Sequence, residues 1–299
     1  MEIKVKYEFD LIGDVYEKFR SNKDVFLTNK QIYDLFEVFW ENNCSGLKTE
    51  EFPNLYIVGA QPGAGKTGLV AKIQSETNLP VLTGDQYRVY HPNIFYFLNN
   101  DNYTEYTSPI NFLMCMLTIA RCFDRNIGFI MENPLKNPKQ NIVYIDEAIK
   151  RKYSVNLLLM AVNKFDSFLG IYNRGANLIK FGNVARFTTN KTHDEGYEGV
   201  LKTLEFPEII SKLNSIEIYN RSLETICKFN NTELLKNTKL KIDFIKNIVE
   251  KERTRPHTKE ENDELEKQKL MVLEYIDKGL ISIDRETFLK ELESRRVSQ

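Results

Sequence analysis

The sequence has no run of apolar residues long enough to cross a membrane. A membrane-spanning helix needs about 20 consecutive apolar residues, and no stretch of the 299 residues approaches that length. Residues 1–19 mix charged with apolar side chains, so they lack the apolar core of a secretion signal. We therefore expect a cytoplasmic protein that has no membrane partner.

Cysteine and histidine are scarce, which leaves little material for a metal centre or a disulfide framework. The four cysteines form no CxxC pair, and the three histidines lie far apart in the sequence. The net charge of −1 provides no general basic excess of the kind that attracts nucleic acid. These features predict reduced thiols and no nucleic-acid partner.

Strand and helix patterns alternate between residues 55 and 219, which is typical of a parallel sheet covered by helices on both faces. The expected strands are short apolar runs at residues 55–58, 79–82, 128–131, 154–162 and 215–219. The expected helices are at residues 8–24, 28–43, 66–76, 109–126, 140–152, 165–178 and 195–213. Thr28 and Gln31 have the spacing of a capping box at the start of the second helix.

A glycine-rich segment joins the first expected strand to the next helix. It consists of Gly59, Ala60, Gln61, Pro62, Gly63, Ala64, Gly65, Lys66, Thr67 and Gly68. Its spacing fits the P-loop, in which glycines let backbone N–H groups turn around phosphate oxygens. Lys66 is expected to reach the β and γ phosphates, and the Thr67 hydroxyl to bind Mg²⁺. The segment predicts ATP and Mg²⁺ as cofactors.

Taken together, these patterns predict an α/β fold, namely a P-loop NTPase three-layer sandwich with a mostly parallel sheet. Residues 1–230 are expected to form the P-loop domain, including the N-terminal helices. Residues 231–299 are rich in Lys and Glu and are expected to form a helical C-terminal extension. Pro256 marks a break in this extension, and Asp284 has the position of an N-cap for its last helix.

The four residues from Asn163 to Asp166 spell NKxD, the motif that reads guanine in GTPases. A GTPase also needs a DxxG motif after the P-loop, whereas the match in this sequence starts at Asp10, before it. We therefore interpret Asn163 as the start of a helix. Asp166 then lies in the first helical turn, where a carboxylate is favourable.

A kinase needs a base near the acceptor hydroxyl and cations around the transferred phosphoryl group. Asp85 ends the expected strand after the P-loop helix, at the sheet edge where ligands bind in α/β folds. It could also act as an N-cap for the residues that follow it. Arg174 and Arg186 come after the last long strand, and arginine is well suited to phosphate oxygens. Asp85, Lys66, Arg174 and Arg186 are the predicted catalytic residues.

These motifs, in this order, resemble the zeta toxin family, the kinase halves of bacterial toxin–antitoxin pairs. The segments that carry the resemblance are the P-loop and residues 85–92, 129–138, 160–174, 184–186 and 218–221, within about residues 50–225. The resemblance implies that Asp85 is the base and that Arg174 and Arg186 contact ATP. It also implies an acceptor such as UDP-N-acetylglucosamine, or a related UDP-amino sugar, and a small helical antitoxin partner. The expected substrate contacts are Asp85, Arg88, Glu132 and Lys136.

Two departures from the family pattern concern the acceptor side. The family commonly has E-G-T followed by Arg after the third strand, whereas this chain has Glu132, Asn133 and Pro134, with Lys136 in place of the arginine. A glutamate that often binds substrate in the family would fall near Met116, where there is no carboxylate. A polar contact of this kind can decide which acceptor is used.

A nucleotide-dependent switch that binds a partner through residues 231–299 is the alternative function.

Overall fold

The computed structural model describes residues 19, 21–83, 86–98, 103–185, 187–230, 232–233 and 238–296. Asp85 and Arg186, two of the expected catalytic residues, lie outside the described residues. Most of the first expected helix, residues 8–24, also lies outside them. Its described end, residues 21–24, forms turns and not a helix.

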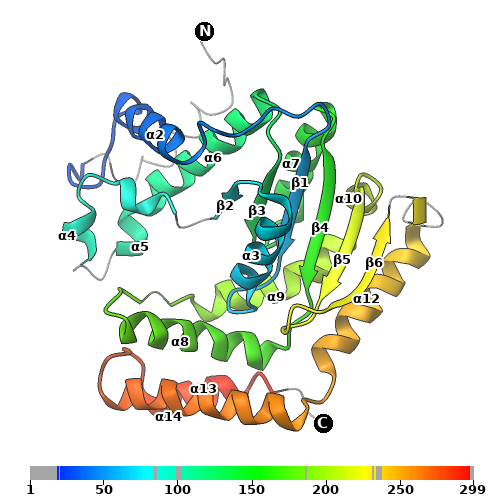
Figure 1. Ribbon diagram of the computed structural model, residues 1–299. Coiled ribbons are helices and arrows are strands. Elements are labelled where there is room, and N and C mark those ends of the chain that lie inside the picture. Colours follow the sequence, from blue (N-terminus) through cyan, green and yellow to red (C-terminus); the bar gives the residue numbers. More distant parts are fainter. Residues whose placement is uncertain are drawn as a thin grey trace.

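A mostly parallel sheet runs through the middle of the molecule (Figure 1). In the described residues it has six strands in the order β2-β3-β1-β4-β5-β6. Their bounds are Asn54–Gly59 for β1, Val81–Leu82 for β2, Phe129–Asn133 for β3, Ser154–Met160 for β4, Ser215–Tyr219 for β5 and Thr225–Asn230 for β6. The first five strands are parallel, which confirms the predicted fold class. The antiparallel strand β6 was not predicted.

Helices cover both faces of the sheet. Those before the C-terminal segment are α2 (Asn29–Asn43), α3 (Lys66–Thr77), α4 (Ile94–Leu98), α5 (Tyr103–Tyr106), α6 (Ser108–Asp124), α7 (Pro138–Lys150), α8 (Lys164–Lys180), α9 (Asn190–Leu204) and α10 (Pro207–Ile210), with a 3-10 turn at Arg88–Tyr90. The capping box of Thr28 and Gln31 at α2 is confirmed. The segment 195–213, which was expected to be largely helical, contains the end of α9 and the short α10, with a break before Pro207.

The two faces of the sheet bury different apolar side chains. On one face, α3 packs Leu69 and Ile73 against strand residues such as Val58 and Leu158. The opposite face carries the larger cluster, which includes Leu157 of β4 and residues of α2, α6, α7 and α9. The alternation of side chains along the central strands thus produces the three-layer sandwich.

The C-terminal segment forms three helices: α12 (Thr238–Thr254), α13 (Lys259–Asp277) and α14 (Arg285–Glu293). Asp284 caps α14, as predicted, by accepting a hydrogen bond from the Thr287 amide. Helix α12 adds Ile245 and Val249 to the larger core cluster. Helices α13 and α14 lie along α8 (Figure 1) and share a second apolar cluster with it.

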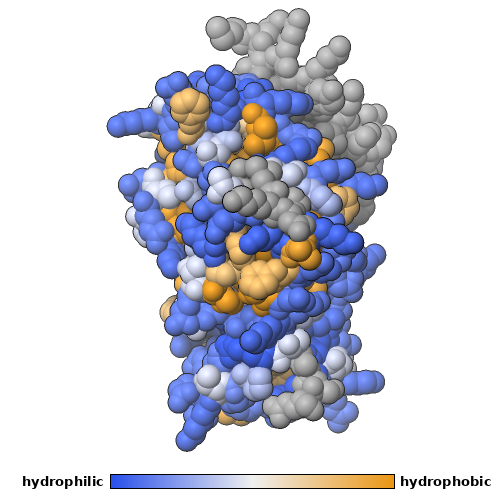
Figure 2. Space-filling model, turned by 90° about the vertical axis from the view of Figure 1, so that its right-hand side faces the viewer, coloured by the Kyte–Doolittle hydropathy of each residue, from blue (hydrophilic) through white to orange (hydrophobic). Residues whose placement is uncertain are grey.

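The face that carries β6 and α12 is mostly hydrophilic, with apolar side chains gathered near its middle (Figure 2). The large exposed apolar residues of these two elements are Ile226, Leu240 and Phe244. Phe244 also contacts the edge of Phe229 at a centroid distance of 5.9 Å, so it helps to attach α12 to the edge strand. No helix within the described ranges has both the length and the apolar character needed to cross a bilayer.

Candidate active site

The glycine-rich segment forms a tight loop between the end of β1 and the first turn of α3. Gly63 and Gly65 have positive φ angles of 77° and 97°, which non-glycine residues rarely adopt. A side chain at Gly63 would also place its Cβ 1.9 Å from the backbone oxygen of Ser167 in α8. The loop therefore packs directly against α8. It leads into the N-terminus of α3, and a helix N-terminus is suited to binding an anion.

Lys66 lies buried beneath this loop, with 8% of its surface exposed. Its Nζ donates hydrogen bonds to the backbone oxygens of Ala60 at 2.8 Å and Gln61 at 2.9 Å. Burial lowers the pKa of Lys66 to about 8, the Glu132 carboxylate opposes this change, and the Arg174 guanidinium adds to it. The charges of Glu132 and Arg174 thus both act on the Lys66 amine. Phosphate oxygens at the loop would give this amine a stronger partner than neutral carbonyls.

Thr67 and Gly68 begin α3 next to Lys66 and are exposed to solvent. Thr67 also lines a cavity of about 420 Å³ between α3, β2 and the end of α2. The described residues contain no group of three or more acidic, His or Cys side chains that could hold a metal ion. Mg²⁺ in P-loop sites takes few protein ligands and shares the phosphates and water. The Thr67 hydroxyl fits that requirement.

The end of β3 brings Glu132 beside the P-loop. In the parallel register Val58 pairs with Glu132 and Gly59 with Asn133, so both strands end at the same edge. The Asn133 side chain accepts from the Leu135 amide at 2.7 Å and donates to Asn141 at 3.0 Å. Asn133 therefore fixes the turn that follows Glu132. Nothing in the sequence alone assigned it this function.

Lys136, an expected substrate contact, lies on the turn after β3 and faces α9. Its Nζ is 3.8 Å from the Glu195 carboxylate. Partial burial lowers the pKa of Lys136, and the nearby Glu195 opposes this. Lys136 is thus a cation at the edge of the site that already has one acidic neighbour.

Arg88, also expected to contact substrate, is 8% exposed and hydrogen-bonds to other parts of the chain. Its guanidinium donates to the backbone oxygen of Thr104 at 2.9 Å and to the Thr107 hydroxyl at 2.7 Å. These bonds join the 3-10 turn to α5 and to the start of α6. Neither of these bonds links Arg88 to Lys66 or Glu132.

The NKxD residues have the local function that was expected of them. The Asn163 side chain caps α8 by accepting from the Phe165 amide at 2.8 Å. Asp166 lies in the first turn and is 7% exposed. Burial raises the pKa of Asp166, and the neighbouring His257 and Arg221 oppose this change. Arg221, two residues after the end of β5, donates to the Gly63 oxygen at 3.3 Å, a P-loop contact that we did not predict.

A chain of hydrogen bonds links Ser167 to His193 and His193 to Asp194. Ser167 Oγ is 2.9 Å from His193 Nε2, and His193 Nδ1 is 2.9 Å from Asp194. The order is that of a hydrolase triad, but Ser167 and His193 are both fully buried. The serine hydroxyl is also 3.0 Å from the Asn163 oxygen. A nucleophile must reach its substrate, so this group joins α8 to α9 and serves packing.

Comparison with known proteins gives consistent matches. The zeta toxin family model matches residues 41–233. The toxin zeta of Streptococcus agalactiae is 27% identical over 199 residues, covering 65% of this chain and 69% of that protein. The toxin zeta of Enterococcus hirae is 27% identical over 202 residues, covering 64% and 71%. A structure from the PezAT chromosomal toxin–antitoxin system of Streptococcus pneumoniae has a TM-score of 0.69 at 18% identity, covering 85% of this chain and 99% of that one.

Proposed function

Because this chain belongs to the zeta toxin family, we propose that it is an ATP-dependent kinase that phosphorylates a hydroxyl of a small molecule. The observation that carries the proposal is the environment of Lys66. A buried amine lies under a P-loop, and the charges of Glu132 and Arg174 both act on it. An arrangement of this kind favours a polyphosphate whose terminal group is to be transferred.

In the proposed reaction, the P-loop amides and Lys66 bind the β and γ phosphates of ATP. Mg²⁺, when bound, offsets the charge of these phosphates, and the Thr67 hydroxyl provides an oxygen atom suited to hold it. Asp85 takes the proton from the acceptor hydroxyl, and Arg174 and Arg186 stabilise charge on the phosphoryl oxygens. Lys136 and Glu132 contact the acceptor.

We propose UDP-N-acetylglucosamine or a related UDP-amino sugar as the acceptor class, on the basis of family membership. The test is to incubate the protein with MgATP and UDP-N-acetylglucosamine, and separately with a metabolite extract, and to search for new phosphorylated products by mass spectrometry. A new product supports the kinase. Capture of a protein partner that depends on nucleotide, without any transfer, would support a switch instead.

Two substitutions separate ATP binding from transfer. Lys66→Ala should abolish both binding and turnover, because the buried cation for the phosphates is lost. Asp85→Ala should reduce turnover by about 10²-fold or more, the contribution of a general base, while ATP still binds. Lys30→Ala and Asp34→Ala are matched controls, since these residues form an exposed ion pair on α2. Near-normal turnover by Asp85→Ala would show that the assignment of the base is wrong.

We further propose that the protein is the toxin of a toxin–antitoxin pair. The support is its family and the relative from the PezAT toxin–antitoxin system. Expression of the wild-type protein should stop bacterial growth, whereas the same level of Lys66→Ala should not. A small helical antitoxin that covers the nucleotide site should restore growth.

A further inference from the structure

The P-loop residue Gln61 is fully buried, and its side chain is fixed on both sides. Its Nε2 donates to the backbone oxygen of Val162 at 2.8 Å and to the Ser167 hydroxyl at 3.2 Å. Its Oε1 accepts from Arg253 at 3.3 Å. The backbone oxygen of the same residue accepts from Lys66. Gln61 is therefore hydrogen-bonded to Lys66 through its backbone and to Arg253 through its side chain.

Arg253 comes from the last turn of α12, in the C-terminal segment, and is 1% exposed. Besides Gln61, its guanidinium donates to the backbone oxygen of Tyr197 at 2.9 Å and stacks on the Tyr197 ring at 4.1 Å. Burial lowers the pKa of Arg253 to about 10. One guanidinium nitrogen thus holds Gln61, and another is fixed on α9.

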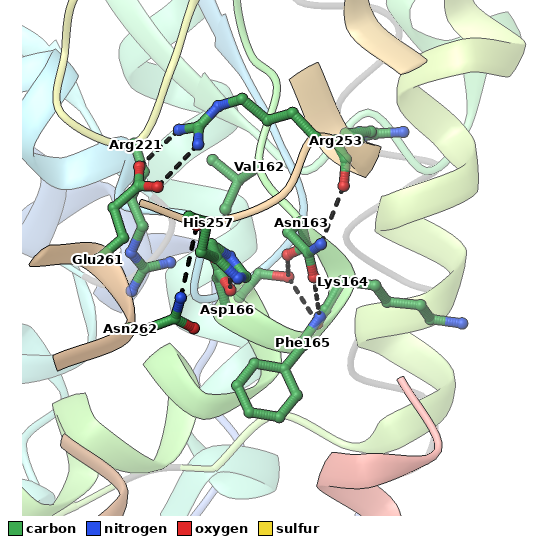
Figure 3. Close-up of polar contacts among 12 residues, drawn as sticks. Val162, Asn163, Lys164, Phe165, Asp166, Arg221, Arg253, His257, Glu261 and Asn262 are labelled. Atoms are coloured by element: carbon green, nitrogen blue, oxygen red, sulfur yellow. Dashed lines mark hydrogen bonds and ion pairs between the residues drawn. The ribbon is translucent and has the colours of Figure 1, made fainter. Parts of the chain in front are cut away.

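The NKxD segment contacts the last turn of α12 and the residues that follow this helix (Figure 3). The Asn163 side chain donates to the backbone oxygen of Arg253 at 3.0 Å. His257 Nε2 lies 3.0 Å from the Asp166 carboxylate. Two residues of this motif therefore hold the 253–257 segment beside the P-loop, which gives them a function unrelated to guanine.

Packing alone does not explain a buried arginine at this position. Burying a cation is unfavourable unless its donors are paired, and the Nε of Arg253 has no acceptor among the described residues. An apolar side chain of similar length would fill the same space at a lower cost. The contacts that an apolar residue could not make are those to Gln61 and Tyr197.

We propose that Arg253 is a positioning residue for ATP binding. It holds the side-chain amide of Gln61 in place, so that the backbone oxygen of Gln61 stays hydrogen-bonded to Lys66. This keeps the P-loop in its phosphate-binding shape. The C-terminal segment then contributes to the ATP site through a residue that does not itself contact ATP. This inference rests on the proposed function, since it concerns the same site.

The test uses the full-length chain and titration with a fluorescent ATP analogue in the presence of Mg²⁺. Arg253→Met keeps the length and apolar stem of the side chain but removes its donors. We expect it to raise the Kd for MgATP by about tenfold or more, the usual effect of losing a hydrogen bond to a charged donor. Arg253→Lys should recover part of the affinity. In a double-mutant cycle with Gln61→Ala, the two losses should be strongly non-additive.

Val272→Ala is the control for a general loss of stability. Val272 is fully buried in the apolar cluster that α13 shares with α8, and its side chain has no group that could hydrogen-bond to Gln61 or Lys66. This variant should unfold at a lower urea concentration and yet bind MgATP as tightly as the wild type. Equal affinity of Arg253→Met and wild type would overturn the inference, as would equal losses in Arg253→Met and Val272→Ala. A wild-type protein that does not bind MgATP would instead refute the proposed function, and the inference with it.

Discussion

The lowered pKa of Lys66 makes ATP affinity depend on pH in a direction that can be worked out in advance. With a pKa of about 8, Lys66 in the free protein is about nine-tenths protonated at pH 7 and about one-tenth protonated at pH 9. The Kd for MgATP should therefore rise about tenfold between pH 7 and pH 9. The terminal phosphate of ATP loses its last proton near pH 6, so the ligand changes little over this range.

The assay is the same fluorescent titration, carried out every half pH unit at constant ionic strength. Lys66→Arg is the control, because arginine stays charged throughout and its profile should be flat even if its affinity is lower. A flat wild-type profile between pH 7 and pH 9 would refute the reasoning. It would mean that the amine keeps an ordinary pKa despite its burial.

The same group predicts how stability changes with pH in the absence of nucleotide. The folded pKa of about 8 lies below the ordinary value of 10.5. Between these two pH values the unfolded chain binds more protons at this lysine than the folded chain does. The contribution of Lys66 to the free energy of unfolding therefore increases as the pH rises through this window. Lys66→Met should remove that part of the slope in urea unfolding experiments.

Two further substitutions test the loop and its acidic neighbour. Gly63→Ala should abolish measurable MgATP binding, because its Cβ would fall 1.9 Å from the Ser167 oxygen at a φ of 77°; binding as tight as that of wild type would show that the loop can move away from α8. Glu132→Gln removes the charge that opposes the lowering of the Lys66 pKa. The bend in the affinity profile should then move below pH 8, and an unchanged bend would argue against direct coupling of Glu132 with Lys66.

The sequence predicted the elements whose signals are local. The P-loop, the capping box at Thr28 and the N-cap at Asn163 each depend on residues a few positions apart. The strand β6 escaped prediction because Thr225–Asn230 is largely exposed and has no continuous apolar run. Its place in the sheet depends on antiparallel pairing with β5, which the turn before it makes possible.

The parts of the site that the sequence did not predict depend on contacts between distant residues. Arg88 follows Asp85 in a motif that resembles the family, and only the fold shows its guanidinium bonded at Thr104 and Thr107. The contact of Arg253 with Gln61 spans 192 positions. No periodicity or spacing rule could pair these two residues, since neither carries a local signal for the other.

That separation of 192 positions also affects how the protein folds. Contacts between residues far apart in the chain require a large loss of chain entropy before they can form. Because Arg253 on α12 holds the side chain of Gln61, the P-loop can reach its final shape only after α12 has packed against the rest of the domain. The shape of the loop therefore depends on folding of the whole domain and not on local folding alone.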